Sequence, residues 1–422
     1  MKALLYRLKK IHASHCLAVV FVLFILYVGS AALPQLIDTT VSLSKGNLSL
    51  REYIRTTDSQ YKNMLPLSVY VPTFKNSGTY INVNGLMANL MDQKFTNDRV
   101  KLKNGHLTGV TASTPSDEIL QSVADNIASL HSKQAERGKH FLFVMTPCQI
   151  SKFEDLLPVG YTDTANDTAD RLLEMLRERG VQCLDLRDAL HEDGITHAEA
   201  FFITDHHWTA ETGFWAYGKI VEKLSALGYV SEVHSDYIDP DNFNFTIHEK
   251  SFLGSSGKRM GIFYAGIDDF CVISPKFDTS IQVKYDGDET QYSGSYADTV
   301  NIYYPDCMYE QKDYFLFMPY GTYGHSDTTP VLRTNQNAPE NTKLMLIGDS
   351  MNNVSFSLMS LYASDCLEVD MRYLNKEFGE IDLADFNSYY QDFNPDTIVL
   401  MINPNGCTDT NATFPFFSQE AS

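Results

Sequence analysis

Three short, largely apolar runs constrain the fold of this chain more than any other feature. They lie at residues 141–145, 344–347 and 396–402. Strands that are buried on both faces carry such runs, and parallel sheets bury both faces of their strands because helices cover them. These runs therefore predict strands of a parallel sheet in the interior of a domain.

Segments with helical periodicity alternate with these runs. Apolar residues recur at helical spacing between Ser116, the expected N-cap, and Gly138, where we expect the helix to stop. Residues 168–179 predict a second helix that ends at Gly180, and residues 181–186 predict another strand. The alternation predicts an α/β fold in which helices flank a parallel sheet.

The N-terminal residues form a segment of a different kind. Four Lys and Arg side chains lie within the first ten residues, and an apolar run without a charge follows at residues 16–33. Its length suffices for one crossing of a bilayer, and the preceding cations predict a cytoplasmic N-terminus over residues 1–15. Small residues at 29–32 instead offer the cleavage site of a signal peptide. Either alternative exports the remaining chain, and the anchor predicts a single-pass protein of the cell membrane with an extracellular domain.

The exported part divides by composition. Residues 34–115 mix prolines, polar patches and short apolar stretches, and we interpret them as a stalk or N-terminal extension that packs on the main domain. The main domain covers residues 116–416. Within it, residues 230–340 are rich in Tyr, Asp, Gly and Ser, and they predict an irregular, β-rich insertion. Residues 417–422 are a tail.

Charge and cysteine content argue against several classes of partner and site. The net charge of -20 disfavours nucleic acid and anionic membrane surfaces as partners. The seven cysteines include no close pair such as Cys-x-x-Cys, so the sequence suggests neither a zinc site nor a redox motif. We predict no metal and no cofactor. The 422 residues, 44% of them hydrophobic, suffice for a sizeable core in one large domain or two smaller ones.

Two motifs that lie far apart in the sequence carry most of the chemical information. Residues 205–209 read Asp-His-His-Trp-Thr, and Thr209 is the expected N-cap of a helix that runs to about Leu227. Residues 348–350 read Gly-Asp-Ser after the strand at 344–347. A serine becomes a nucleophile when a histidine takes its proton and a carboxylate fixes the histidine tautomer. The backbone N–H of Ser350, at a strand-to-helix turn, could help to stabilise an oxyanion.

Each part of this set also has a simpler interpretation. Gly-Asp-Ser is a common turn, and Asp205 could serve only to start a helix. A tryptophan such as Trp208 is more often a packing residue than a platform for a substrate. Paired histidines are more often surface or core residues than catalysts. On the predicted α/β scaffold, the combination favours acyl transfer through a serine.

The two motifs together resemble those of the DHHW proteins, relatives of the alginate O-acetylation proteins AlgJ and AlgX. These proteins have SGNH-type hydrolase folds in permuted order, in which the Asp/His motif precedes the serine motif. The resemblance covers roughly residues 75 to 416, most of the exported part. Three weaker stretches also fit it, at residues 78–85, 254–259 and 393–396.

The resemblance implies a role for each motif residue. Asp205 would orient, His207 would be the base and Ser350 would be the nucleophile. The family implies transfer of an acetyl group to a polysaccharide hydroxyl, after a membrane-embedded partner of the MBOAT type supplies acetyl across the bilayer.

Secondary site residues follow from the same resemblance. An asparagine in a G-x-N-D block completes the oxyanion hole of SGNH proteins, whereas residues 403–406 here read Asn-Pro-Asn-Gly. Asn403 and Asn405 are therefore the candidate positions, with Asn403 preferred. Arg259, next to Lys258, is a candidate contact for an anionic glycan.

Three functions remain open at the level of the sequence. The first is a membrane-anchored extracellular O-acetyltransferase that acts on a cell-surface or secreted polysaccharide. The second is a carbohydrate esterase with the same three residues, in which water replaces the sugar. The third is a non-catalytic protein that binds or assembles polysaccharide. A metal-dependent phosphoesterase is rejected, because the further aspartates of that class are not found.

Overall fold

The computed structural model describes residues 19, 21–23, 77–285, 291–300, 314–315, 317–323, 330–371 and 383–408. The chain separates into two compact units, Met1–Met87 and Ala88–Ser422, and the second contains both sequence motifs. Most of the predicted anchor and stalk and the whole tail lie outside the described residues. Among the residues that are described, no helix is both long and apolar enough to cross a bilayer.

The second unit is built on a mixed sheet whose core is parallel. Five strands run parallel to their neighbours, and the last of them, β12, pairs with an antiparallel extension. In the described residues the order is β5 (Cys183–Asp185), β4 (His140–Met145), β13 (Thr397–Ile402), β11 (Glu340–Gly348), β12 (Ala363–Asp370), β10 (Val331–Asn335), β8 (Ile281–Tyr285) and β9 (Gln291–Gly294). The predicted α/β fold is confirmed, and the predicted parallel sheet is confirmed in part, because β10, β8 and β9 extend it with antiparallel pairing.

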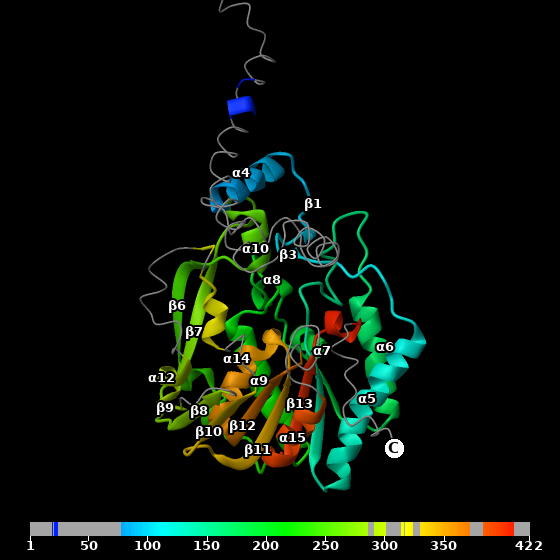
Figure 1. The fold of residues 1–422 in the computed structure, drawn as a ribbon, viewed down its shortest axis with the longest axis vertical. Coiled ribbons are helices and arrows are strands. Elements are labelled where there is room, and N and C mark those ends of the chain that lie inside the picture. The colour runs from blue at the N-terminus through cyan, green and yellow to red at the C-terminus, as the bar shows by residue number, and fades with distance from the viewer. Residues whose placement is uncertain are drawn as a thin grey trace, which may run out of the picture. The chain divides into compact units, whose positions relative to one another are not determined.

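Both faces of the central strands are buried, as their apolar runs predict. In β4, Phe141, Phe143 and Met145 enter one core, whereas Leu142 and Val144 enter the other. Helices cover each face. The first core is completed by α5 (Asp117–Glu136), α6 (Ala165–Glu178) and α15 (Leu383–Phe393), and the second by α9 (Ala210–Ala226) and α14 (Asn353–Tyr362). Figure 1 shows α5 and α6 on one side of the strands and α9 and α14 on the other.

The helix ends follow the local sequence. The Ser116 side chain caps α5 by accepting from the N–H of Ile119. The chain leaves the helix through Gly138, whose φ of 67° suits glycine because this residue has no Cβ. Thr209 caps α9 in the same way, by accepting from the N–H of Thr212. These predicted ends are confirmed.

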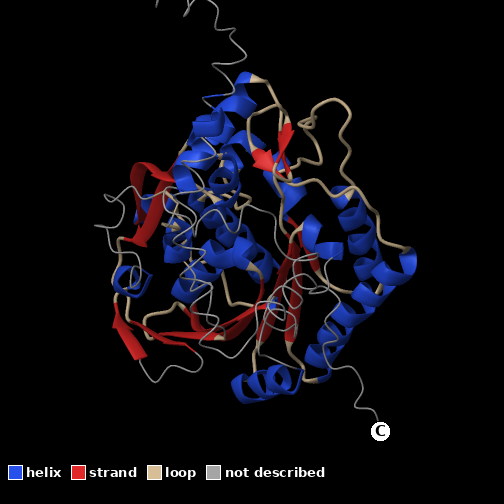
Figure 2. Cartoon of the chain, turned by 45° about the horizontal axis from the view of Figure 1, so that its top comes forward, coloured by secondary structure: helices blue, strands red, loops and turns tan. Residues whose placement is uncertain are grey.

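The insertion over residues 230–340 does not form a single separate lobe. β6 (Phe243–Phe252) and β7 (Asp268–Pro275) form a two-stranded sheet of their own, which Figure 2 shows apart from the main strands. The strands β8, β9 and β10 instead extend the main sheet. In β8 every second residue is buried, the pattern of a strand with one face on the core.

The remaining elements are short or lie before the first predicted helix. They are α4 (Ser77–Leu90), β1 (Phe95–Thr96), β2 (Arg99–Lys101), β3 (Leu107–Thr108), α7 (Leu186–Glu192), α8 (His197–Ala200), α10 (Ser255–Met260), α11 (Ile262–Ala265) and α12 (Tyr296–Val300). Short 3-10 helices include η3 (Ser235–Tyr237), η4 (Pro240–Asn242), η5 (Pro319–Thr322), η6 (Ser350–Asn352) and η8 (Pro404–Thr408).

Candidate active site

The first motif lies on a tight loop that enters α9. Phe201 and Trp208 form an isolated antiparallel bridge across its base. The N–H of Thr209 donates to the carbonyl of Ala200 at 2.9 Å and closes the loop at the helix start. Trp208 is fully buried in the core under the loop, which agrees with its simpler interpretation as a packing residue. The loop is therefore a rigid support for the side chains between these contacts.

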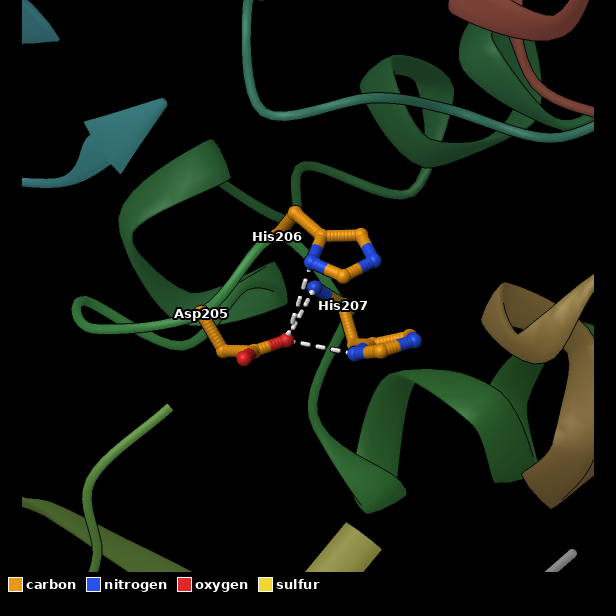
Figure 3. A group of neighbouring side chains, drawn as sticks. All are labelled: Asp205, His206 and His207. Atoms are coloured by element: carbon orange, nitrogen blue, oxygen red, sulfur yellow. Dashed lines mark hydrogen bonds and ion pairs between the residues drawn. The ribbon is translucent and has the colours of Figure 1, made fainter. Parts of the chain in front are cut away.

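Within this loop, Asp205 and His207 are bound to each other. The Asp205 Oδ1 atom accepts from the backbone N–H of His207 at 3.0 Å and also lies in hydrogen-bonding contact with His207 Nδ1 (Figure 3). Both side chains are buried, with exposed fractions of 0% and 3%. The contact fixes the imidazole so that its other nitrogen, Nε2, faces away from the carboxylate.

His207 Nε2 reaches the second motif. It lies 3.0 Å from Ser350 Oγ, across a sequence separation of 143 residues. The structure thus brings a carboxylate, an imidazole and a hydroxyl from two distant motifs into one hydrogen-bonded series. This is the order of groups that an activated serine requires.

Asp205 is held as a carboxylate. Burial raises its pKa, but the neighbouring His207 and His206 and the hydrogen bonds outweigh burial, so the pKa lies well below its ordinary value. One of these hydrogen bonds comes from the N–H of Ser255, at the start of α10, to Asp205 Oδ2. The backbone of Gly254 passes so close that a Cβ there would lie 2.2 Å from the Cβ of Asp205. The N-terminal end of α10 therefore packs directly against Asp205.

Ser350 stands where β11 ends and η6 begins, and its side chain is half-buried. The carboxylate of Asp349 organises this turn, because its Oδ1 accepts from the N–H of Met351 at 2.9 Å. Among the described residues, no group accepts a hydrogen bond from the N–H of Ser350. That N–H is consequently available to a ligand oxygen.

The secondary candidates take different places. The Asn403 amide donates to Asp349 Oδ2 at 3.0 Å, and its oxygen accepts from the N–H of Asn405 at 2.9 Å, so Asn403 ties the serine turn to the end of β13. The Asn405 side chain is exposed and accepts from the Thr111 hydroxyl at 3.2 Å. Arg259 is half-buried in α10, and its backbone carbonyl accepts from Asn97. Roles in binding an oxyanion or substrate remain predictions for these residues.

The structure adds residues that sequence reasoning missed. Asp268 is buried and accepts from the N–H groups of Ile203 and Thr204 at 2.9 Å and 2.8 Å, immediately before Asp205. Tyr320, from the insertion, stacks on the His207 ring. No local motif marks either residue, because one aspartate or tyrosine in a segment rich in both carries no signal until the chain folds.

Asp205, His206 and His207 also form the one cluster of possible metal-ligand atoms found among the described residues, with these atoms within 4.8 Å of one another. The donor atoms of Asp205 and His207 are already engaged. Asp205 binds His207 and the N–H of Ser255, and the two nitrogens of His207 face Asp205 and Ser350. A metal ion would have to break these contacts, so this set fits proton transfer better than metal binding.

The fold and its motifs have relatives. Residues 107–238, which contain Asp205 and His207, match the family described as "SGNH hydrolase-like domain, acetyltransferase AlgX". The predicted resemblance is confirmed. The comparison with curated proteins finds no match.

Solved structures support the same fold. The chain is similar to PatB1 of Bacillus cereus, with 19% identity and a TM-score of 0.60, over 75% of this chain and 99% of that chain. It is similar to PatB1 with a sulfonyl adduct, with 17% identity, a TM-score of 0.59 and the same coverage. A DHHW family protein from Eubacterium siraeum DSM 15702 has 16% identity and a TM-score of 0.53, over 78% of this chain and 98% of that chain. The fold is an SGNH-like α/β fold.

Proposed function

We propose that this protein is an O-acetyltransferase that moves an acetyl group through Ser350 to a hydroxyl of a cell-surface or secreted polysaccharide. The observation that carries the proposal is the hydrogen-bonded series in which His207 Nε2 lies 3.0 Å from Ser350 Oγ and His207 Nδ1 faces Asp205. The match to an acetyltransferase family over residues 107–238 supports the acyl group as the one transferred.

The first half of the reaction loads the serine. Ser350 Oγ attacks the carbonyl carbon of the acetyl donor while His207 Nε2 takes the hydroxyl proton. The buried carboxylate of Asp205 stabilises the imidazolium and holds its Nδ1–H. The tetrahedral intermediate then collapses, the bond to the leaving group breaks, and the leaving group takes the proton from His207. In this proposal the N–H of Ser350 donates to the oxyanion.

The second half of the reaction transfers the acetyl group from Ser350 to the acceptor. A sugar hydroxyl gives its proton to His207 and attacks the acetyl-serine ester, and the product ester forms as the bond to Ser350 Oγ breaks. The proton on His207 returns to Ser350 Oγ, so the enzyme is regenerated. Water in the place of the sugar would give hydrolysis, which is the esterase alternative.

The proposal extends to the cellular setting. The apolar run at residues 16–33 and the cations before it favour a single-pass anchor with the catalytic unit outside the cell. In that setting, acetyl would come from a membrane-embedded donor protein of the MBOAT type, and the acceptor would be a polysaccharide. Both partners rest on the family resemblance.

The decisive experiment is intact mass spectrometry of the full-length protein with p-nitrophenyl acetate. We expect an acetyl adduct at Ser350 that is absent from Ser350→Ala. Asp205→Asn should slow acylation on the order of 10³- to 10⁴-fold, because the amide supports the wrong imidazole tautomer. A sulfonyl fluoride is a second probe, since the related PatB1 has been solved with a sulfonyl adduct. Equal acylation of wild type and Ser350→Ala would refute the proposal.

The acylated protein then separates transfer from hydrolysis. Addition of acetyl-free oligosaccharides should discharge the adduct faster than buffer does, with the acetyl group recovered on the sugar. Discharge at the same rate, with free acetate as the product, would identify an esterase instead. Glycan binding by a wild-type protein that never acylates would indicate a polysaccharide-binding role.

A further inference from the structure

The insertion contributes an aromatic side chain, Tyr320, to the candidate site. Tyr320 lies in η5, within the described segment 317–323, and only 2% of it is exposed. Its ring stacks on the His207 imidazole, with centroids 4.0 Å apart and planes inclined by 20°. Phe202 meets the Tyr320 ring edge-on at 6.3 Å. The base is thus packed between its own loop and a residue from a distant part of the chain.

The hydroxyl of the same tyrosine contacts the serine turn. Tyr320 OH donates to the carbonyl of Met351 at 2.9 Å, and Met351 immediately follows Ser350. The N–H of Met351 is held from the other side by Asp349 at 2.9 Å. One side chain therefore contacts both the imidazole and the backbone next to the hydroxyl that the imidazole must reach.

The segment that carries Tyr320 is itself held in place. Lys258, in α10, donates from Nζ to the carbonyl of Phe317 at 2.8 Å. At the other end, Tyr323 OH donates to the carbonyl of Cys271 at 3.0 Å and accepts from the N–H of Ile273 at 2.7 Å. The position of the Tyr320 ring is therefore fixed from both ends of the segment.

We propose that Tyr320 is a positioning residue that sets the distance and orientation between His207 and Ser350. This inference rests on the proposed acyl transfer and deepens it. The ring restricts rotation of the imidazole, and the hydroxyl holds the serine turn. The face of an aromatic ring also attracts a cation, so Tyr320 stabilises the imidazolium that forms when His207 takes the serine proton.

Two substitutions separate the two contacts. Tyr320→Phe keeps the stacked ring and removes only the hydrogen bond to Met351, so acylation should slow about 2- to 10-fold. Tyr320→Leu removes both contacts, so acylation should slow roughly 10- to 100-fold. Both effects should appear in the rate constant at saturation rather than in KM, because Tyr320 acts on the protein groups.

The comparison of the two variants distinguishes positioning of the base from general loss of structure. Both variants lose the hydroxyl that bonds Met351, and only Tyr320→Leu also loses the ring that stacks on His207. A larger loss of rate in Tyr320→Leu than in Tyr320→Phe, at an unchanged KM, therefore reports the contact between the ring and the imidazole.

Tyr296→Phe is the matched control. It also removes one buried tyrosine hydroxyl, which bonds the Ser357 hydroxyl at 2.9 Å between α12 and α14. Its acylation rate and its His207 ring signal should equal those of wild type. Melting curves of all three variants verify that the rates compare folded proteins.

A second readout does not depend on turnover. In full-length protein with isotope-labelled histidine, the His207 ring signal, assigned with His207→Gln, should move downfield in Tyr320→Leu and stay near its wild-type position in Tyr320→Phe. An unchanged rate and an unchanged His207 signal in Tyr320→Leu would overturn the inference. If the signal moves in Tyr320→Leu but the wild type never acylates, the proposed transfer is refuted, while the contact between Tyr320 and the imidazole is retained.

Discussion

His106 illustrates how burial controls a single residue of this fold. Its exposed fraction is 2%, and its Nδ1 atom has no hydrogen-bond partner among the residues that the structure describes. Burial, together with the nearby His197, lowers the pKa of His106 to about 4, and Glu154 offsets only part of this effect. The folded protein therefore keeps this imidazole neutral at a pH where the unfolded chain would protonate it.

Acid should destabilise the protein through this histidine. The pKa is lower in the folded state, so the stabilisation is complete above the unfolded value of 6.5 and is lost as the pH falls toward about 4. The loss amounts to about 3 kcal/mol. In melting experiments from pH 7.5 to 4.5, His106→Gln should lose less stability than wild type. The same acid dependence in both proteins would contradict the assignment.

For single residues, the sequence identifies those whose proposed roles follow from their neighbours in the sequence. Asp205, His207 and Ser350 could be named because each stands at a predicted helix start next to partners with matching chemistry. Tyr320 and Asp268 could not be named, since their contacts depend on how the insertion folds back onto the loop before α9. Catalytic residue types are visible in a sequence, whereas the residues that position them depend on tertiary contacts.

Among the helices, the contact between α9 and α14 matters most for the site. α9 begins directly after the loop that carries His207, and α14 begins directly after the turn that carries Ser350. The two helices approach closely at Gly213, where a Cβ would lie 2.6 Å from the Cβ of Val354. The hydroxyl of Ser355 also donates to the carbonyl of Gly213 at 3.0 Å. The separation of the helices therefore limits the separation of His207 and Ser350.

Two glycines of α9 provide a matched test. Gly213→Ala should destabilise the protein by about 1–3 kcal/mol through overpacking and should also slow acylation of Ser350. Gly218→Ala, where a Cβ meets nothing within 4 Å, should stabilise it by about 0.5–1 kcal/mol because alanine favours a helix interior. Urea unfolding and acylation rates measure both effects. Equal responses to the two substitutions would show that the helix contact is not restrictive.

The elements that the sequence predicts best are those with one dominant signal. The apolar run at 344–347 and the caps Ser116 and Thr209 identify their elements directly, although β11 begins earlier, at Glu340. β10 carries Arg333 and alternates buried and half-buried residues, so the sequence did not distinguish it from the rest of the insertion. Its direction follows from pairing with β8 and β12, which only the fold supplies.

For the molecule as a whole, a buried ion pair joins the insertion to the parallel core. Arg333 of β10 binds Glu368 of β12, where the antiparallel part of the sheet begins. Burial raises the pKa of Glu368, and Arg333 offsets only part of that effect. The pair therefore links two parts of the sheet at a position where both side chains are largely shielded from water.

Removing one partner should cost more stability than removing both. Arg333→Met leaves the Glu368 carboxylate buried without a cation, and we expect a loss of about 3–5 kcal/mol. The double variant Arg333→Met/Glu368→Met should regain most of this loss, because apolar side chains can replace a buried pair. Thermal melting of the wild type, the two single variants and the double variant tests this. A double variant as unstable as Arg333→Met would contradict it.

The ends of the main sheet affect how the protein behaves in concentrated solution. In the described part of the chain, the outermost strands are β5, with three residues, and β9, with four. Aggregation through sheets requires a long row of unpaired backbone groups on which another chain can add a strand. Strands this short provide little template, so we expect the two ends of the main sheet to resist the addition of a strand from another chain, even in concentrated solution.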